Sequence, residues 1–238
     1  MKLRFGDLFT GAGAYWRGGP EALVAVAGVF FFLPQLANLL FVPVFDATGL
    51  EGVALTQAML DFFMRNLPWS AAQFIAESMG VATVLLMLLD PARPSVGEAL
   101  GRALRLLPGL VVARLIAAAA VMLGLLLLFV PGFYLSGRTF LTSAVYVFEP
   151  QRGPGGAAVA GFERTRGNGW LFFLAVFGVS AVWYIFGGMI MQGALAAGPF
   201  AAAPLKALVA ALVAGCMLLI VLLEATAYRA LSGPKHGM

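Results

Sequence analysis

The chain contains a series of apolar segments, each about as long as a lipid bilayer is thick. Its 238 residues are 61% hydrophobic and only 11% charged, which leaves too little polar surface to cover a soluble domain. A helix that crosses the hydrocarbon core needs roughly 20 mostly apolar residues. The sequence therefore predicts an all-α fold, a polytopic membrane helical bundle that forms one membrane domain over residues 1–238. The six candidate spans are residues 22–44, 70–89, 107–130, 133–148, 170–191 and 206–225.

Continuous apolar segments favour helices over a membrane β-barrel, whose strands alternate between apolar and polar residues. Pro34 lies within the first span and predicts a bend there, because proline removes a helical hydrogen bond. Pro131 and Gly132 separate the third and fourth spans. A connection this tight predicts that those two helices are antiparallel neighbours.

Basic residues are unevenly distributed over the connecting segments. With six spans, eleven of the fifteen lysines and arginines fall on the side of both chain ends. The positive-inside rule then predicts a multi-pass protein of the inner or plasma membrane, with both termini in the cytoplasm. The net charge of +4 is spread over loops next to the membrane, which suits anionic lipid headgroups at the cytoplasmic face. Nucleic acid is not an expected partner.

Three segments on the predicted cytoplasmic side have a similar layout. They begin at Gly6, Gly97 and Gly156, and each continues through apolar and then basic or aromatic residues into a span. This pattern predicts three repeated units, each a cytoplasmic amphipathic interfacial helix followed by a transmembrane hairpin. For the middle unit, an extension of the third span into the cytoplasm is an equal alternative.

Ionisable residues at bilayer depth are the candidate site, because burying a charge in hydrocarbon is costly. Glu77 and Arg138 lie at similar depths from the outer side, so we expect them to pair. Arg114 is expected to pair with Glu149 or Glu224 nearer the inner side. Such pairs can fix the register of the helices, or they can form a path for protons or anions.

The residues needed for common enzyme chemistry are scarce. His236 is the single histidine and lies in a polar tail, and Cys216 is the single cysteine. The sequence contains no phosphate-binding or dinucleotide-binding glycine motif. We therefore predict a protein that is not an enzyme, with no catalytic residues, no cofactor and no metal site.

Residues 95–175 carry a set of motifs typical of one membrane family. The residues are Pro131-Gly132-Phe133-Tyr134-Leu135, Arg138, Glu149, Thr165-Arg166-Gly167 and Trp170. In them the chain resembles the bacterial family that includes YciC-like proteins and the membrane domain attached to some glycerophosphoryl diester phosphodiesterases. The resemblance implies a bacterial inner-membrane protein with about six spans, but little about function, because the phosphodiesterase chemistry belongs to a separate soluble domain. The chain departs from the pattern at Ala160-Gly161, where the family leads us to expect an Arg-Ser pair.

Two functions remain open from the sequence. The first is a non-enzymatic scaffold or a component of envelope or membrane homeostasis. The alternative is a small transporter or lipid-handling protein with a polar cleft lined by Gln35, Asn38, Glu77 and Arg138. Small residues recur at four-residue spacing in the last span and permit close helix contact, either within the bundle or in a homo-oligomer. They are Ala207, Ala211 and Gly215.

Overall fold

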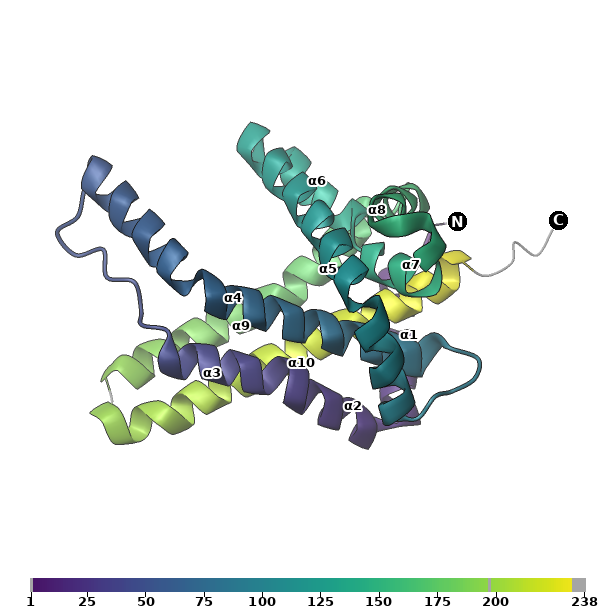
Figure 1. The fold of residues 1–238 in the computed structure, drawn as a ribbon, viewed down its shortest axis with the longest axis horizontal. Coiled ribbons are helices and arrows are strands. Elements are labelled where there is room, and N and C mark those ends of the chain that lie inside the picture. Colours follow the sequence, from purple (N-terminus) through teal and green to yellow (C-terminus); the bar gives the residue numbers. More distant parts are fainter. Residues whose placement is uncertain (1, 197, 233–238) are drawn as a thin grey trace.

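The computed structural model describes residues 2–196 and 198–232, which fold into helices joined by short connections, apart from a longer one over residues 42–51 (Figure 1). Five of the described helices are long and apolar enough to cross a membrane. The all-helical, membrane-type fold is therefore confirmed. In chain order the elements are α1 (Phe5–Gly18), α2 (Pro20–Ala27), the π-helical turn η1 (Gly28–Phe32), α3 (Leu33–Phe41), α4 (Gly52–Leu89), α5 (Val96–Leu127), α6 (Phe129–Arg138), α7 (Thr142–Phe148), the 3-10 turn η2 (Pro150–Arg152), α8 (Gly153–Arg164), α9 (Gly169–Ala196) and α10 (Gly198–Ser232).

The five spanning-length helices overlap five of the six predicted spans. They are the continuous helix Pro20–Phe41, which comprises α2, η1 and α3, then α4, α5, α9 and most of α10. The remaining prediction, residues 133–148, is not a single helix, because α6 ends at Arg138 and α7 begins only at Thr142. The chain thus breaks in the middle of an apolar segment, and the reason lies in contacts with distant residues described below.

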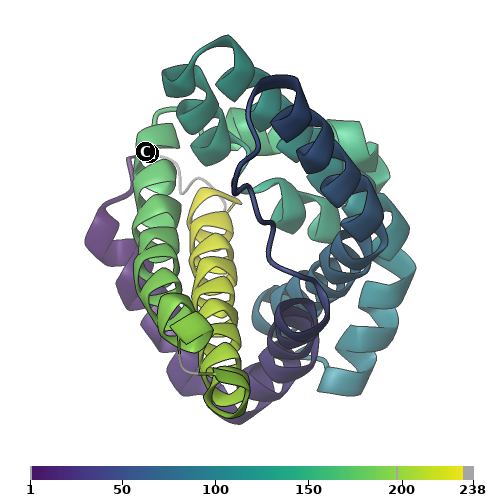
Figure 2. The ribbon, with the colours of Figure 1, turned by 90° about the vertical axis from the view of Figure 1, so that its left-hand side faces the viewer.

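Most long helices follow the long axis of the molecule, whereas the α5–α6 hairpin diverges from it (Figure 1). Viewed along that axis, α9 lies beside α10, and α4, α5 and α6 lie on the opposite side (Figure 2). The backbone N–H of Leu3 donates to Asn168, and the Arg164 guanidinium donates to Ser232. The start of α1, the α8–α9 connection and the end of α10 therefore meet at one end of the molecule, which we call the termini end.

The α5–α6 connection differs from the predicted one. The turn is at Leu128, whereas Pro131 and Gly132 lie within α6. Helices α5 and α6 do pack as antiparallel neighbours. A Cβ atom on Gly124 would come within 2.9 Å of the Cα atom of Gly132, so both glycines are needed for this close approach.

Local sequence sets the other helix boundaries and bends. Ser95 and Glu98 form a capping box at the start of α5, which satisfies backbone N–H groups of the first turn. The helix then continues through Pro108 to Leu127, so the amphipathic stretch of the middle unit is an extension of the third span. The π-helical turn η1 immediately precedes Pro34, where proline cannot complete the α-helical ladder.

The core is concentrated toward the termini end. Residues 78–86 in the second half of α4 are all buried, as are most residues of α7 and many in the second half of α10. By contrast, Leu126 and Leu127 at the tip of the α5–α6 hairpin are each 79% exposed. An apolar surface of this kind is expected where lipid surrounds a helix. The ionisable residues of the candidate site lie around the buried part.

Candidate functional site

Arg138, at the end of α6, is buried with a relative exposure of 5%. Its Nε and Nη2 atoms both donate to the carbonyl oxygen of Phe162, at 3.1 and 2.5 Å, and Nη1 donates to the hydroxyl of Tyr134 at 2.9 Å. The guanidinium also lies 3.9 Å from the centre of the Phe162 ring. Phe162 is in the last turn of α8, where unpaired carbonyls carry partial negative charge. The cation is therefore bound by the end of a helix.

The predicted pair between Glu77 and Arg138 does not form. Glu77 on α4 instead accepts a hydrogen bond from Gln73 at 2.9 Å, and Gln73 also donates to Gln35 on α3 at 2.8 Å. The pair was predicted from the equal depth of the two residues in the membrane, and that depth was calculated on the assumption that residues 133–148 form one straight span. Through these two glutamine side chains, Glu77 takes part in a hydrogen-bonded link between α3 and α4.

Arg114 lies on α5 and faces α4. Its Nη1 atom donates to the hydroxyl of Ser78 at 2.7 Å, and its guanidinium lies 4.7 Å from the centre of the Phe74 ring. Glu77 and Glu224 are the carboxylates whose charge acts on it. Of the two partners predicted for Arg114, the structure thus places Glu224 within electrostatic range.

Glu224 on α10 is buried, with a relative exposure of 5%. Its carboxylate accepts hydrogen bonds from the backbone N–H of Ala144, at 2.8 Å, and of Ser143. Both residues lie in the first turn of α7, where helical N–H groups have no partner within the helix. Glu224 therefore caps the helix that follows the break in the predicted fourth span.

Glu149 belongs to a different cluster, at the termini end. It forms ion pairs with Arg152 at 2.5 Å and with Arg164 at 2.6 Å, and it accepts a hydrogen bond from the Tyr228 hydroxyl at 3.2 Å. Burial alone would raise the pKa of Glu149, but the hydrogen bonds from the two arginines outweigh burial and hold this pKa below its usual range. The predicted contact with Arg114 is not made.

Most motif residues of the family resemblance lie at the α6–α8–α9 junction, whereas Gly132 packs against α5 and Glu149 lies in the termini-end cluster. The Thr165 hydroxyl donates to the carbonyl oxygen of Arg138 at 2.7 Å, and the rings of Tyr134 and Trp170 lie 5.7 Å apart. Gly167 has a φ of +83°, a conformation that favours glycine and turns the chain into α9. Arg166 follows Thr165 in the same turn, where its N–H donates to the carbonyl of Glu163. These motif residues therefore form a junction between helices.

Two hollows are present that the sequence did not indicate. A cavity of about 910 Å³ at the termini end, which we call the Arg93 cavity, lies between α1, the α4–α5 connection and the end of α10. A second hollow of about 570 Å³, the α1–α10 groove, is lined by apolar and small residues, among them Ala211 and Gly215. Two of the small residues expected to mediate packing thus line a groove. No periodic pattern marks such sites, because their walls come from distant segments.

Among residues 2–196 and 198–232, no group of three or more histidine, cysteine, aspartate or glutamate side chains could hold a metal ion. Comparison of the chain with known proteins found no matching family model, no matching curated protein and no matching solved structure. The family resemblance stays a prediction from the motifs.

Proposed function

We propose that this protein is a non-enzymatic scaffold or a membrane-homeostasis component that resides in the inner or plasma membrane. One observation carries the proposal: the ionisable side chains within the apolar segments are bonded to neighbouring backbone or polar side chains. Arg138 binds Phe162 and Tyr134, Arg114 binds Ser78, and Glu224 binds the start of α7. Charges held in this way fix the positions of helices, whereas a transport path would need groups that can change partners.

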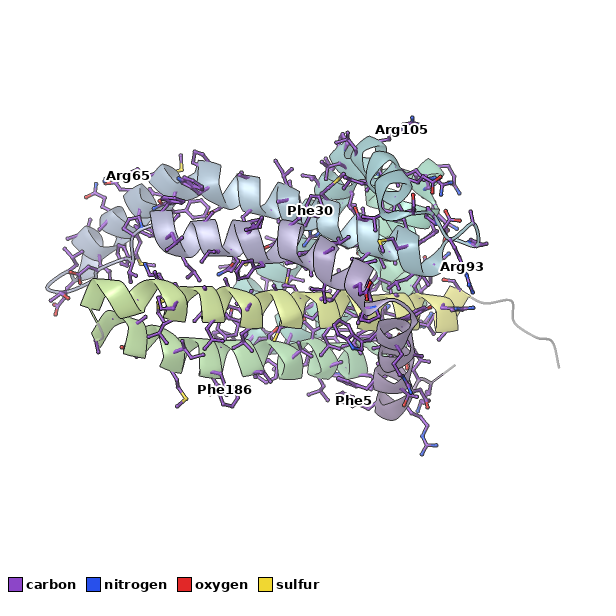
Figure 3. All side chains as sticks on the ribbon, turned by 90° about the horizontal axis from the view of Figure 1, so that it is seen from below. Phe5, Phe30, Arg65, Arg93, Arg105 and Phe186 are labelled. Atoms are coloured by element: carbon purple, nitrogen blue, oxygen red, sulfur yellow. The ribbon has the colours of Figure 1, made fainter. Side chains whose placement is uncertain are left out.

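The orientation with both termini in the cytoplasm is supported by the placement of charge. Figure 3 shows Arg93 and Arg105 at the termini end and Arg65 at the opposite end. Arg102, Arg152 and Arg164 also lie in the connections and helices of the termini end. A surface of this kind would meet the anionic headgroups of the cytoplasmic leaflet.

Helix α1 has the features of an interfacial helix. It runs across the end of α10 (Figure 3), with Leu8 and Ala12 buried. Phe5, at 45%, and Trp16, at 41%, are exposed large apolar side chains on the same helix. Together with the extended start of α5 and with α8, it supports the proposed three units, in each of which a helical segment precedes a span.

Reconstitution into liposomes tests the scaffold proposal against transport. We expect proteoliposomes to hold an imposed pH gradient as long as empty liposomes do. After extraction in a mild detergent, the protein should purify together with defined protein partners or as a homo-oligomer. A proton or anion flux that disappears in the Glu77→Gln variant would overturn the proposal and favour a transporter.

A lipid-handling role is the second candidate, and the α1–α10 groove is the observation that favours it. The groove lies between α1, the α2–η1 region and α10, and Trp16 is one of its lining residues. A Cβ atom on Gly215 meets nothing within 4 Å, so Gly215→Leu places a larger side chain at the groove from an open backbone position. A lipid-handling protein should lose a co-purified phospholipid in this variant, as seen by native mass spectrometry, but keep it in Gly188→Leu, an open position on α9.

A further inference from the structure

The Arg93 cavity combines segments that are far apart in the sequence. Tyr15, Gly18 and Gly19 come from α1 and its connection to α2. Residues 87–91, Arg93 and Pro94 come from the end of α4 and the following turn, and Tyr228, Arg229 and Ser232 come from the end of α10. Its volume of about 910 Å³ is within the range of pockets that enclose small molecules. The fold thus builds a hollow of ligand size at the termini end.

Two arginines of the cavity have no carboxylate partner among the described residues. Arg93 and Arg229 both line it, and neither takes part in the ion pairs of the described residues. Asp90 is the acidic residue among the lining residues. Its two oxygens are already occupied by the Arg102 guanidinium and by the backbone N–H of Ala92. An anion entering the cavity would therefore meet two available guanidinium groups.

The backbone at Arg93 is strained. Its φ is +46°, a region that residues other than glycine adopt at a cost. The turn that holds it is closed by a hydrogen bond of 3.0 Å from the Arg93 N–H to the Asp90 carbonyl. Glycine would fit this position without strain, yet the chain places an arginine there, at the wall of a cavity. Strain of this kind is common where a side chain has a binding role.

The rest of the lining is mixed in polarity. Ala22, Leu23 and residues 87–89 are apolar, whereas Tyr15 and Ser232 add hydroxyl groups next to the arginines. The Tyr15 hydroxyl accepts only a long hydrogen bond of 3.5 Å from Arg229, which is weak by its length. Both partners of this bond can therefore turn to a ligand at little cost.

We propose that the Arg93 cavity binds a ligand that carries a phosphate group, with the phosphate held by Arg93 and Arg229 and the less polar part of the ligand against the apolar lining residues. Guanidinium groups match phosphate oxygens in geometry and charge. The phosphate can belong to a headgroup of the adjoining lipid leaflet or to a free phosphorylated molecule, since both present the same chemistry to the arginines.

Binding by the full chain in detergent tests this site. The probes are inorganic pyrophosphate, dioctanoyl phosphatidic acid in the same micelles, and dioctanoyl phosphatidylcholine as the lipid without net charge. The variants are Arg93→Gly, which removes the charge and suits the positive φ, and Arg229→Gln. Arg105→Gln is the matched control, because Arg105 is also exposed at the termini end but does not line the cavity (Figure 3).

We expect Arg93→Gly and Arg229→Gln each to weaken binding of the anionic probe roughly tenfold or more, with Arg105→Gln within about twofold of the parent. Arg93→Gly should melt at the same temperature as the parent or higher, so that lost binding cannot be attributed to unfolding. Binding of phosphatidic acid alone identifies a lipid headgroup, and binding of pyrophosphate identifies a free phosphate compound. The proposal is overturned if no anionic probe binds, if phosphatidylcholine binds equally well, or if Arg105→Gln weakens binding as much as the cavity variants.

Discussion

Replacing Arg138 by glutamine should destabilise the fold strongly, and the effect should be independent of Glu77. The substitution removes the two donors to the Phe162 carbonyl, the bond to Tyr134 and the stacking over the Phe162 ring. Truncating a buried group with charge-assisted hydrogen bonds costs about 1.5–3 kcal/mol, and a desolvated cation–π contact adds about 1–2 kcal/mol. Because such contributions overlap, we expect a loss of about 3 kcal/mol in the free energy of unfolding.

A double-mutant cycle with Glu77→Gln measures whether the two residues interact. The single change at Glu77 keeps an oxygen that can accept from Gln73 and should cost about 1 kcal/mol or less. Since the two side chains bind different partners, the coupling energy should be within about 0.5 kcal/mol of zero.

The assay is reversible unfolding of the purified protein in mixed micelles, titrated with sodium dodecyl sulfate and followed by tryptophan fluorescence. Arg105→Gln serves as a control, because an exposed arginine away from such contacts should change stability by no more than about 0.5 kcal/mol. A loss below about 1 kcal/mol for Arg138→Gln, or a coupling energy above about 1 kcal/mol, would show that Arg138 is not bound as described.

Three further outcomes follow from the packing and from the termini-end cluster. Gly137→Ala should cost about 2 kcal/mol or more in the same assay, because its Cβ would collide with the Gly169 carbonyl and come within 2.8 Å of the Phe173 nitrogen. The control is Gly178→Ala, which should be neutral or stabilising because nothing lies within 4 Å of that Cβ position. Equal effects of the two substitutions would refute the contact. Glu149 has a lowered pKa in the folded state, so its stabilising effect is present above the usual carboxyl range and is lost as the pH falls through the folded pKa. Between neutral and acid pH, the melting temperature should therefore fall less in Glu149→Gln than in the parent. Parallel curves of melting temperature against pH would contradict this. Glu224→Leu should lower stability by about 2–3 kcal/mol because it leaves N–H groups of α7 unpaired, and a change below about 0.5 kcal/mol would mean that they find other partners.

The sequence was sufficient to predict the class of fold and five segments that overlap the long apolar helices, although α4 begins at Gly52 and not at the predicted residue 70. The reason is that hydrocarbon imposes a simple requirement, a run of apolar residues that satisfies its own backbone hydrogen bonds. The capping box at Ser95 and Glu98 is equally local. Features whose cause lies within one turn of helix can be inferred from neighbouring residues.

The break between α6 and α7 could not be predicted in this way. Residues 139–141 contain neither proline nor glycine. The groups that stabilise the break are Thr165, which binds the Arg138 carbonyl from 27 positions away, and Glu224, which binds Ala144 from 80 positions away. The error in pairing Arg138 with Glu77 followed directly, because the depth of Arg138 was measured along a span that is not continuous.

The bond between Glu224 and the start of α7 also has a consequence for biogenesis. When α7 leaves the ribosome, the carboxylate that completes its first turn has not yet been synthesised, since α10 follows α7 in the chain. Until α10 is inserted, α7 has exposed amide groups that hydrocarbon cannot satisfy. The segment should therefore remain at the membrane surface or be shielded by the insertion machinery, and it should reach its final position only after α10 has entered the bilayer.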